Sequence, residues 1–223
     1  EDEKMLEMLE MEFMQRAWLA GLIMAVICPL IGSFLVLRRQ SLIGDGLGHI
    51  AFAGVAGGAL WGASPVLSAA AATILGALAI EKVRTKLSDA ADMVLAIFFY
   101  SGMGLAVIFT GLNKDGGFNL GSILFGSLMM VSSKDLLIVA ALGLCTVLFV
   151  VLFYRPLQYL TFDEKSAKVA GLPVERLNLL LALLTALTVA LSMRIVGLLL
   201  VSAMMVIPVA CALQTARSFR GTI

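Results

Sequence analysis

The chain has 223 residues, of which 61% are hydrophobic and 14% are charged, and its mean hydropathy is +1.02. Average soluble domains are roughly 45–50% apolar and about 25% charged, so this composition is typical of an integral membrane protein. Sixteen Lys and Arg against fifteen Asp and Glu leave a formal charge of +1. Without a basic surplus, we expect no nucleic-acid partner. The cysteines Cys28, Cys145 and Cys211 lie far apart in apolar runs, and we interpret them as small buried hydrophobic residues.

A helix that crosses the hydrocarbon core needs about 20 mostly apolar residues. The sequence predicts an all-α bundle of seven such spans, at 13–37, 48–61, 66–80, 93–111, 136–154, 177–192 and 195–213. The apolar stretch 120–131 is too short to cross, and we interpret it as a re-entrant or interfacial helix. No long linker divides the chain, so we expect residues 1–223 to form a single transmembrane domain in contact with lipid.

The distribution of cationic side chains predicts the orientation of the bundle. If 120–131 does not cross and the loop 38–47 is cytoplasmic, eleven of the sixteen Lys and Arg residues lie on the cytoplasmic side. These are Arg38, Arg39, Lys82, Arg84, Lys86, Arg155, Lys165, Lys168, Arg176, Arg217 and Arg220, against Lys4, Arg16, Lys114, Lys134 and Arg194 outside. A crossing by 120–131 would move the four cations of the loop 155–176 outside. We therefore favour seven spans, with the acidic N-terminal residues outside.

The single histidine of the chain lies in the second predicted span. His49 follows Asp45 by four residues, a spacing that places both side chains on one helix face, one turn apart. Ionisable groups within the membrane are costly and are functional candidates by default. Imidazole and carboxylate together suit a divalent cation such as Zn²⁺ or Mn²⁺. Two ligands do not complete a zinc site, although a two-fold dimer would supply four; alternatively, the pair is a structural hydrogen-bonded tether.

The predicted cytoplasmic loop 155–176 contains a short helix with clear end signals. Thr161 and Glu164 have the spacing of a capping box, and Asp163 adds negative charge at the helix N-terminus. Ala167 and Ala170 keep one face small, and Gly171 is placed to adopt the left-handed conformation that ends the helix. The loop is larger than a simple connection needs, which favours a docking element over an ordinary interfacial helix.

Small residues fill the second and third predicted spans. Gly54 and Gly58 have the G-x-x-x-G spacing that lets helix backbones approach closely in lipid. Close helix packing explains this pattern, and a translocation pathway would use the same property. The sequence has no G-x-x-x-x-G-K-[ST] loop, no G-x-S-x-G and no H-E-x-x-H motif, so we expect a transport chain rather than an enzyme. If ATP drives it, a separate chain must hold the nucleotide.

Four segments resemble the membrane permeases of bacterial zinc and manganese ABC importers. They are FLVLRRQSLIGDGLGH (34–49) with its small-residue continuation, LFGS (124–127), LTFDE (160–164) through Gly171, and GLLLVSA (197–203) through Pro208. The resemblance covers about 13–217. It implies a homodimer in the bacterial inner membrane, coupled to a cytoplasmic ATP-binding subunit and supplied by an extracellular solute-binding protein. Zn²⁺, which the resemblance of the segment around 38–45 favours, or Mn²⁺ would be cargo that crosses by alternating access, and not a resident cofactor.

By the same resemblance, Asp45 and His49 match the family's metal-pathway ligands, and Thr161, Asp163, Glu164, Ala167 and Gly171 match its ATPase-coupling segment. Gly48 stands where the family usually has Ser, so a hydrogen bond from that hydroxyl would be missing. The chain also stops at Ile223, where such permeases usually continue into at least one more span, so we expect one or two helices to be absent.

Two rival functions stay open at this stage. A secondary metal or proton antiporter usually carries several acidic or His residues deep in different spans. Here the other acidic residues, such as Asp89, Asp92, Asp115 and Asp135, lie at predicted span ends. An ABC permease for an organic metal chelate or a vitamin would leave Asp45 and His49 with a structural role.

Overall fold

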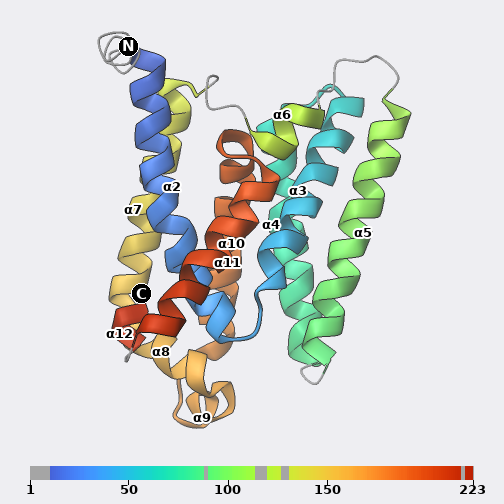
Figure 1. Cartoon of the computed structure of the whole chain (residues 1–223). Helices are drawn as coiled ribbons and strands as arrows, with labels where there is room; N and C mark the ends of the chain where they lie inside the picture. Colours follow the sequence, from blue (N-terminus) through green and yellow to red (C-terminus); the bar gives the residue numbers. More distant parts are fainter. Residues whose placement is uncertain (1–10, 88–89, 114–119, 127–130, 217–218, 223) are drawn as a thin grey trace.

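The computed structural model describes residues 11–87, 90–113, 120–126, 131–216 and 219–222 (Figure 1). Seven described helices are long and apolar enough to cross a membrane. They are α2 (Glu12–Leu37), α3 (Leu42–Leu60), α4 (Pro65–Lys86), α5 (Ala91–Leu112), α7 (Ser133–Leu152), α10 (Val174–Ile195) and α11 (Leu198–Thr215). The predicted all-α bundle with seven spans is confirmed.

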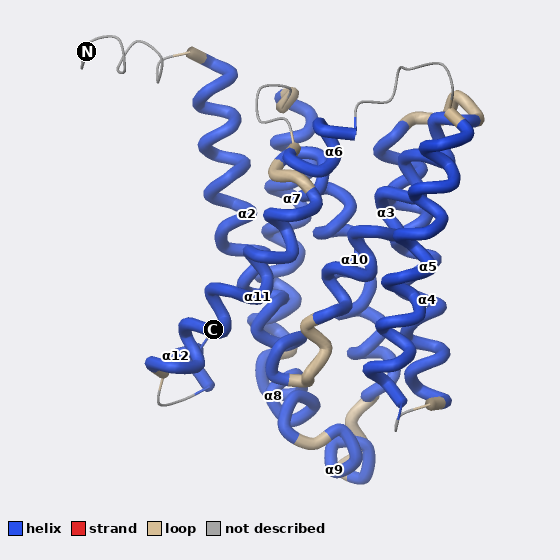
Figure 2. The backbone as a smooth tube through the Cα atoms, turned by 45° about the vertical axis from the view of Figure 1, so that its right-hand side comes forward, coloured by secondary structure: helices blue, strands red, loops and turns tan. Residues whose placement is uncertain are grey.

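The long helices form two groups joined by one central helix. Helices α3, α4 and α5 pack together on one side, and α2, α7 and α11 on the other, as the views in Figures 1 and 2 show. Helix α10 lies between them and contacts α2, α3, α4, α7 and α11. Helix α3 therefore has neighbours on several sides and is among the most buried of the long helices.

Short helices cap the two ends of the bundle. Helix α6 (Leu120–Phe125) lies at the end where α2 begins and packs on α10 and α11 (Figure 1). Helices α8 (Tyr154–Phe162) and α9 (Glu164–Val169) lie at the opposite end, and α12 (Phe219–Thr222) packs on α11. The predicted short helix 120–131 thus ends at Phe125, and 127–130 lie outside the described residues.

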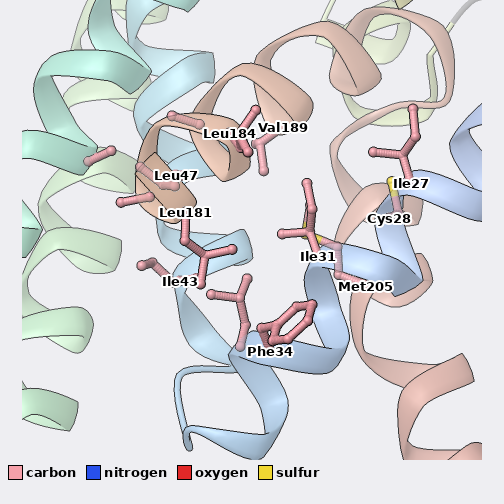
Figure 3. Packing of buried hydrophobic residues seen from close by; sticks show 14 of the residues in the cluster. Ile27, Cys28, Ile31, Phe34, Ile43, Leu47, Leu181, Leu184, Val189 and Met205 are labelled. Atoms are coloured by element: carbon pink, nitrogen blue, oxygen red, sulfur yellow. The ribbon is translucent and has the colours of Figure 1, made fainter. Parts of the chain in front are cut away.

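The largest apolar core joins α2, α3, α10 and α11. Figure 3 shows side chains from these helices meeting, among them Ile31 and Phe34 from α2, Leu47 from α3 and Met205 from α11. Backbones approach closely here, since a Cβ added to Gly32 would lie 1.9 Å from the Met205 carbonyl oxygen. In lipid, such close packing replaces much of the hydrophobic driving force between helices.

Glycines also bring α3 and α4 together. A Cβ on Gly54 would lie 2.7 Å from the Ser68 carbonyl oxygen, and one on Gly58 would lie 2.3 Å from the Ser68 hydroxyl oxygen. The G-x-x-x-G spacing therefore serves helix packing. Of the cysteines, Cys28 is buried, whereas Cys145 and Cys211 are exposed. The prediction that all three are buried was wrong for these two, because an apolar helix in a membrane can turn small apolar residues outward as well as inward.

Helix α3 begins at Leu42, six residues before the predicted start at 48. Glycine is a poor helix former, so Gly44, Gly46 and Gly48 make this segment look like a loop in the sequence. In the structure all three are buried against neighbouring helices, and this packing outweighs their low propensity. The start at Leu42 places Asp45 in the first helical turn, as the predicted shared helix face of Asp45 and His49 requires.

Candidate functional site

Helix α3 carries both predicted metal ligands. Ser41 is its N-cap residue and Asp45 lies in its first turn, where a carboxylate is favoured by the positive end of the helix dipole. His49 lies one turn further on, about 10 Å from the start of the helix by the 1.5 Å rise per residue. Both side chains are half-buried. The structure thus brings Asp45 and His49 to one face of one continuous helix.

The His49 ring packs against helix α5. It lies edge to face with Phe99, with ring centroids 4.7 Å apart, and a Cβ on Gly102 would come within 3.1 Å of the His49 carbonyl carbon. Its Nδ1 atom is buried and, within the described part of the chain, has no hydrogen-bond partner. Buried polar atoms in proteins are nearly always paired, so an orphaned ring nitrogen calls for an explanation, and metal ligation is a common role for such an atom.

Leu198 fills the space beside Gly48. A Cβ on Gly48 would lie 2.2 Å from Leu198 Cδ1 and 3.8 Å from Val189 Cγ1. The sequence predicts only a missing hydroxyl at this position, and the structure adds that an apolar side chain takes its place. Leu198 opens α11 directly after Gly197, whose φ of +92° is one that side chains rarely adopt. In the sequence, Gly197 signals the turn before α11. This turn precedes Leu198, which lies beside Gly48.

Asp45 and His49 form a candidate set of two ligands. Within the described ranges, no group of three or more His, Cys, Asp or Glu side chains could hold a metal ion. Zinc sites are usually four-coordinate, so the described residues alone do not complete one, and water, another protein or a second copy of this chain could supply further donors. An incomplete set of this kind suits transient passage of an ion better than permanent binding.

The predicted capping box at Thr161 was wrong. Helix α8 runs through Thr161 to Phe162, and the Thr161 hydroxyl donates to the Leu157 carbonyl, 2.7 Å away, inside that helix. Asp163 is the N-cap residue of α9: its Oδ1 accepts from the Lys165 and Ser166 amides at 2.9 and 3.1 Å. A threonine hydroxyl can bond to the carbonyl four residues back as readily as it can cap, and here the preceding helix takes it.

Glu164 points into the bundle rather than back to the cap. Its carboxylate lies 3.1 Å from the Arg38 guanidinium and 3.5 Å from that of Arg84, and it accepts from Asn178 Nδ2 at 3.0 Å. Burial raises the pKa of Glu164, but the charges of Arg84 and Arg38 outweigh it, so the pKa lies below its ordinary value. Hydrogen bonds from Ser166 likewise lower the pKa of the exposed Asp163.

The C-terminal end of α9 has the predicted glycine signal. Gly171 has a φ of +79°, its amide donates to Lys168, and the Leu172 amide donates to the Ala167 carbonyl at 3.2 Å. This pair of hydrogen bonds is a Schellman motif. Ala167 is buried and packs inward, so it holds α9 against the bundle and is not part of an outer surface.

The outer surface of this segment carries two apolar side chains that the sequence reasoning missed. Val169 is 90% exposed and Phe162 is 70% exposed. Both lie at the end of the bundle opposite the N-terminus, and Phe162 also contacts Phe219 of α12. The signal was present, since Val169 is the large apolar residue in an otherwise small and charged helix, EKSAKV.

Known proteins resemble the chain over nearly its whole length. The model of the ABC 3 transport family matches residues 10–223. The manganese transport system membrane protein MntC of Halalkalibacterium halodurans is 34% identical, with 92% of this chain and 70% of that protein covered. The high-affinity zinc uptake system membrane protein ZnuB of Haemophilus influenzae is 30% identical, with 93% and 79% covered.

A solved structure agrees with these matches. The structure described as PsaBC from Streptococcus pneumoniae in complex with Fab superimposes with a TM-score of 0.82 at 28% identity, covering all of this chain and 80% of that one. Together with the seven apolar helices, the matches make this a multi-pass protein of the bacterial cell membrane and a transport subunit rather than an enzyme. The chain belongs to the ABC 3 transport family, as a permease subunit.

Proposed function

We propose that this permease moves Zn²⁺ or Mn²⁺ into the cell, and that Asp45 and His49 bind the ion on its way. The relatives named for manganese and for zinc transport support the substrate class. The observation that carries the site is the buried Nδ1 of His49, which has no hydrogen-bond partner among the described residues and lies one turn from Asp45 on a helix surrounded by others. Imidazole and carboxylate bind both ions, so the ligand pair leaves the choice between them open.

Transport requires the site to open to one side of the membrane and then to the other. In the proposed mechanism two copies of the chain form a homodimer and bring together two Asp45 and two His49 side chains, which supplies the four ligands that zinc prefers. An extracellular solute-binding protein delivers the ion. A cytoplasmic ATP-binding subunit then drives the rearrangement that releases it inward.

Helix α9 is the proposed contact with the ATP-binding subunit. The excess of Lys and Arg at the α9 end of the bundle supports a cytoplasmic position for it. Asp163 and Gly171 define its ends, Ala167 holds its inner face, and Val169 and Phe162 offer apolar surface to a partner. Exposed apolar side chains at the tip of a short capped helix are suited to insertion into a groove of another protein.

The test of the site is metal uptake by proteoliposomes that contain the permease, its ATP-binding subunit and the solute-binding protein. His49→Ala and Asp45→Asn should each reduce uptake to background while the ATP-binding subunit still co-purifies. Asp92→Asn is the matched control, because Asp92 is also a carboxylate in the first turn of a long helix but is exposed. Normal zinc and manganese uptake by His49→Ala would refute the site, and uptake of an organic chelate alone would refute the substrate class.

A further inference from the structure

A second polar cluster lies at the α9 end of the bundle, away from Asp45 and His49. We call it the basal cluster. Four separate elements contribute to it: Arg38 from the end of α2, Glu81 and Arg84 from α4, Glu164 from α9 and Asn178 from α10. Arg84 forms a two-pronged pair with Glu81, at 3.1 and 2.8 Å, and also reaches Glu164.

The basal cluster is buried and electrically balanced. The exposed fractions of the Arg38, Arg84 and Glu81 side chains are 5%, 9% and 10%, and that of Glu164 is 40%. Two guanidinium groups face two carboxylates, so the net charge is zero. Buried ion pairs seldom add stability over an apolar core of the same volume, so a cluster of this kind is weak evidence for stability alone. The alternative is that the basal cluster specifies a conformation or transmits a movement. Its connection to α3 through Arg38 supports this alternative.

Arg38 joins this cluster to the helix that carries the candidate site. It is the C-cap residue of α2, and only Arg39, Gln40 and Ser41 separate it from α3. This connector is tightly bonded: the Gln40 amide donates to the Leu35 carbonyl at 2.8 Å, and the Ile43 amide donates to the Gln40 carbonyl at 3.0 Å. Arg39 has a φ of 57°, which is uncommon for a residue with a side chain. The connector is therefore short and closely defined.

The geometry points to Glu164 and Arg38 as positioning residues that transmit movement of α9 to α3. This inference rests on the proposed function, in which the ATP-binding subunit moves α9. Glu164 is the first residue of α9, and its carboxylate holds the Arg38 side chain. Displacement of α9 would pull on Arg38 and hence on the connector, and Asp45 lies only seven residues after Arg38. Glu164 thus acts inside the permease, whereas Val169 and Phe162 face the partner.

An exposed ion pair between α9 and α10 offers a matched control. Lys168 of α9 and Glu175 of α10 form an ion pair at 3.3 Å, but their side chains are 69% and 76% exposed. This pair also joins α9 to a long helix, yet it does not contact the α2–α3 connector. Glu175→Gln therefore removes one carboxylate charge from an ion pair with α9, as Glu164→Gln does, without touching the proposed route.

The experiment measures metal ions taken up per ATP hydrolysed by the reconstituted complex. Glu164→Gln should lower that ratio at least about fivefold, the lower end of typical coupling between sites. Glu175→Gln should leave it unchanged. The double variant Arg38→Met/Glu164→Gln restores a neutral cluster, since Glu81 and Arg84 still balance, but leaves no link from α9 to the connector. Its thermal stability should recover relative to either single variant while the ratio stays low.

Recovery of the uptake ratio together with stability in the double variant would show that the cluster is merely structural and would overturn the inference. Equal losses of the uptake ratio in Glu164→Gln and Glu175→Gln would overturn it too, because the loss of either carboxylate would then have the same effect. If the Glu164→Gln variant fails to assemble with the ATP-binding subunit, the uptake ratio of the charge-balanced double variant still tests the inference. Failure of the wild-type chain to bind an ATP-binding subunit would instead refute the proposed function, so the two failures are distinguishable.

Discussion

The basal cluster and the Asp45–His49 region of this permease differ in how their ionisable groups are paired. In the basal cluster each charged side chain has a partner of opposite charge, and these side chains come from three elements, α2, α4 and α9. On α3, by contrast, His49 Nδ1 is buried without a partner in the described residues, and its ring packs edge to face on Phe99. Polar groups that satisfy each other hold a fold together or transmit its movements. A polar group left unsatisfied in a membrane bundle is available to a ligand.

The largest effect on stability is expected in the basal cluster. Glu81→Gln leaves two buried guanidinium groups facing one carboxylate, and breaking a buried pair by removing one partner costs about 3–5 kcal/mol of folding free energy. Thermal unfolding in detergent measures the loss. Glu175→Gln, which breaks an exposed pair, should cost about 0–1 kcal/mol. Equal effects of the two variants would show that burial does not distinguish these pairs.

A smaller loss is expected beside the candidate site. Gly48→Ser places a side chain where Leu198 lies, and overpacking of this kind costs about 1–3 kcal/mol. Leu198→Ala alone opens a cavity, so it is destabilising too. The double variant should be more stable than the sum of the two losses predicts, by a coupling energy of about 0.5–3 kcal/mol. Strict additivity in a double-mutant cycle would contradict the contact.

The connector between the two regions offers a finer test. Arg39→Val puts a β-branched residue at a φ of 57° and should lower the free energy of unfolding by about 1–3 kcal/mol. Arg39→Gly is the control, because glycine adopts this conformation without strain, and its stability should match or exceed that of the wild type. If Arg39→Val leaves the free energy of unfolding unchanged, the connector is loosely held, and its role as a link would be weakened.

The smallest effect is local to α9. Asp163→Ala removes the cap, so the amides of Lys165 and Ser166 should exchange their hydrogens faster while global stability stays nearly unchanged. Because the pKa of Asp163 lies below its ordinary value of 3.8, the cap's contribution is fully present above that value and is lost as pH falls through the lowered one. Exchange protection that already declines near neutral pH would contradict the capping role.

Local patterns in the sequence were enough to predict much of this protein. The seven spans follow from the length of the apolar runs, and the shared face of Asp45 and His49 follows from the four-residue spacing. Gly171 was predicted as a left-handed helix end and is one. Each of these depends on residues a few positions apart, where helix geometry alone decides the arrangement.

Predictions failed where two local solutions competed. The Thr161 hydroxyl could cap α9 or bond within α8, and only the extent of α8 chooses between them. The apolar run that begins at 48 gave the predicted start of the second span, but α3 begins at Leu42, where Gly44, Gly46 and Gly48 are buried against neighbouring helices. Propensity is worth about 1 kcal/mol for a glycine, less than the packing of several side chains, so tertiary contacts prevailed.

The sequence by itself therefore determined that this chain is a polytopic helix bundle and nominated Asp45, His49 and the α9 segment. Only the tertiary structure decided that Leu198 lies on Gly48 and that Glu164 turns inward to Arg38, a residue 126 positions away. Helical periodicity places neighbours three or four residues apart and carries no information on which helices meet. Those contacts depend on how small residues let backbones approach, which is a property of the whole bundle.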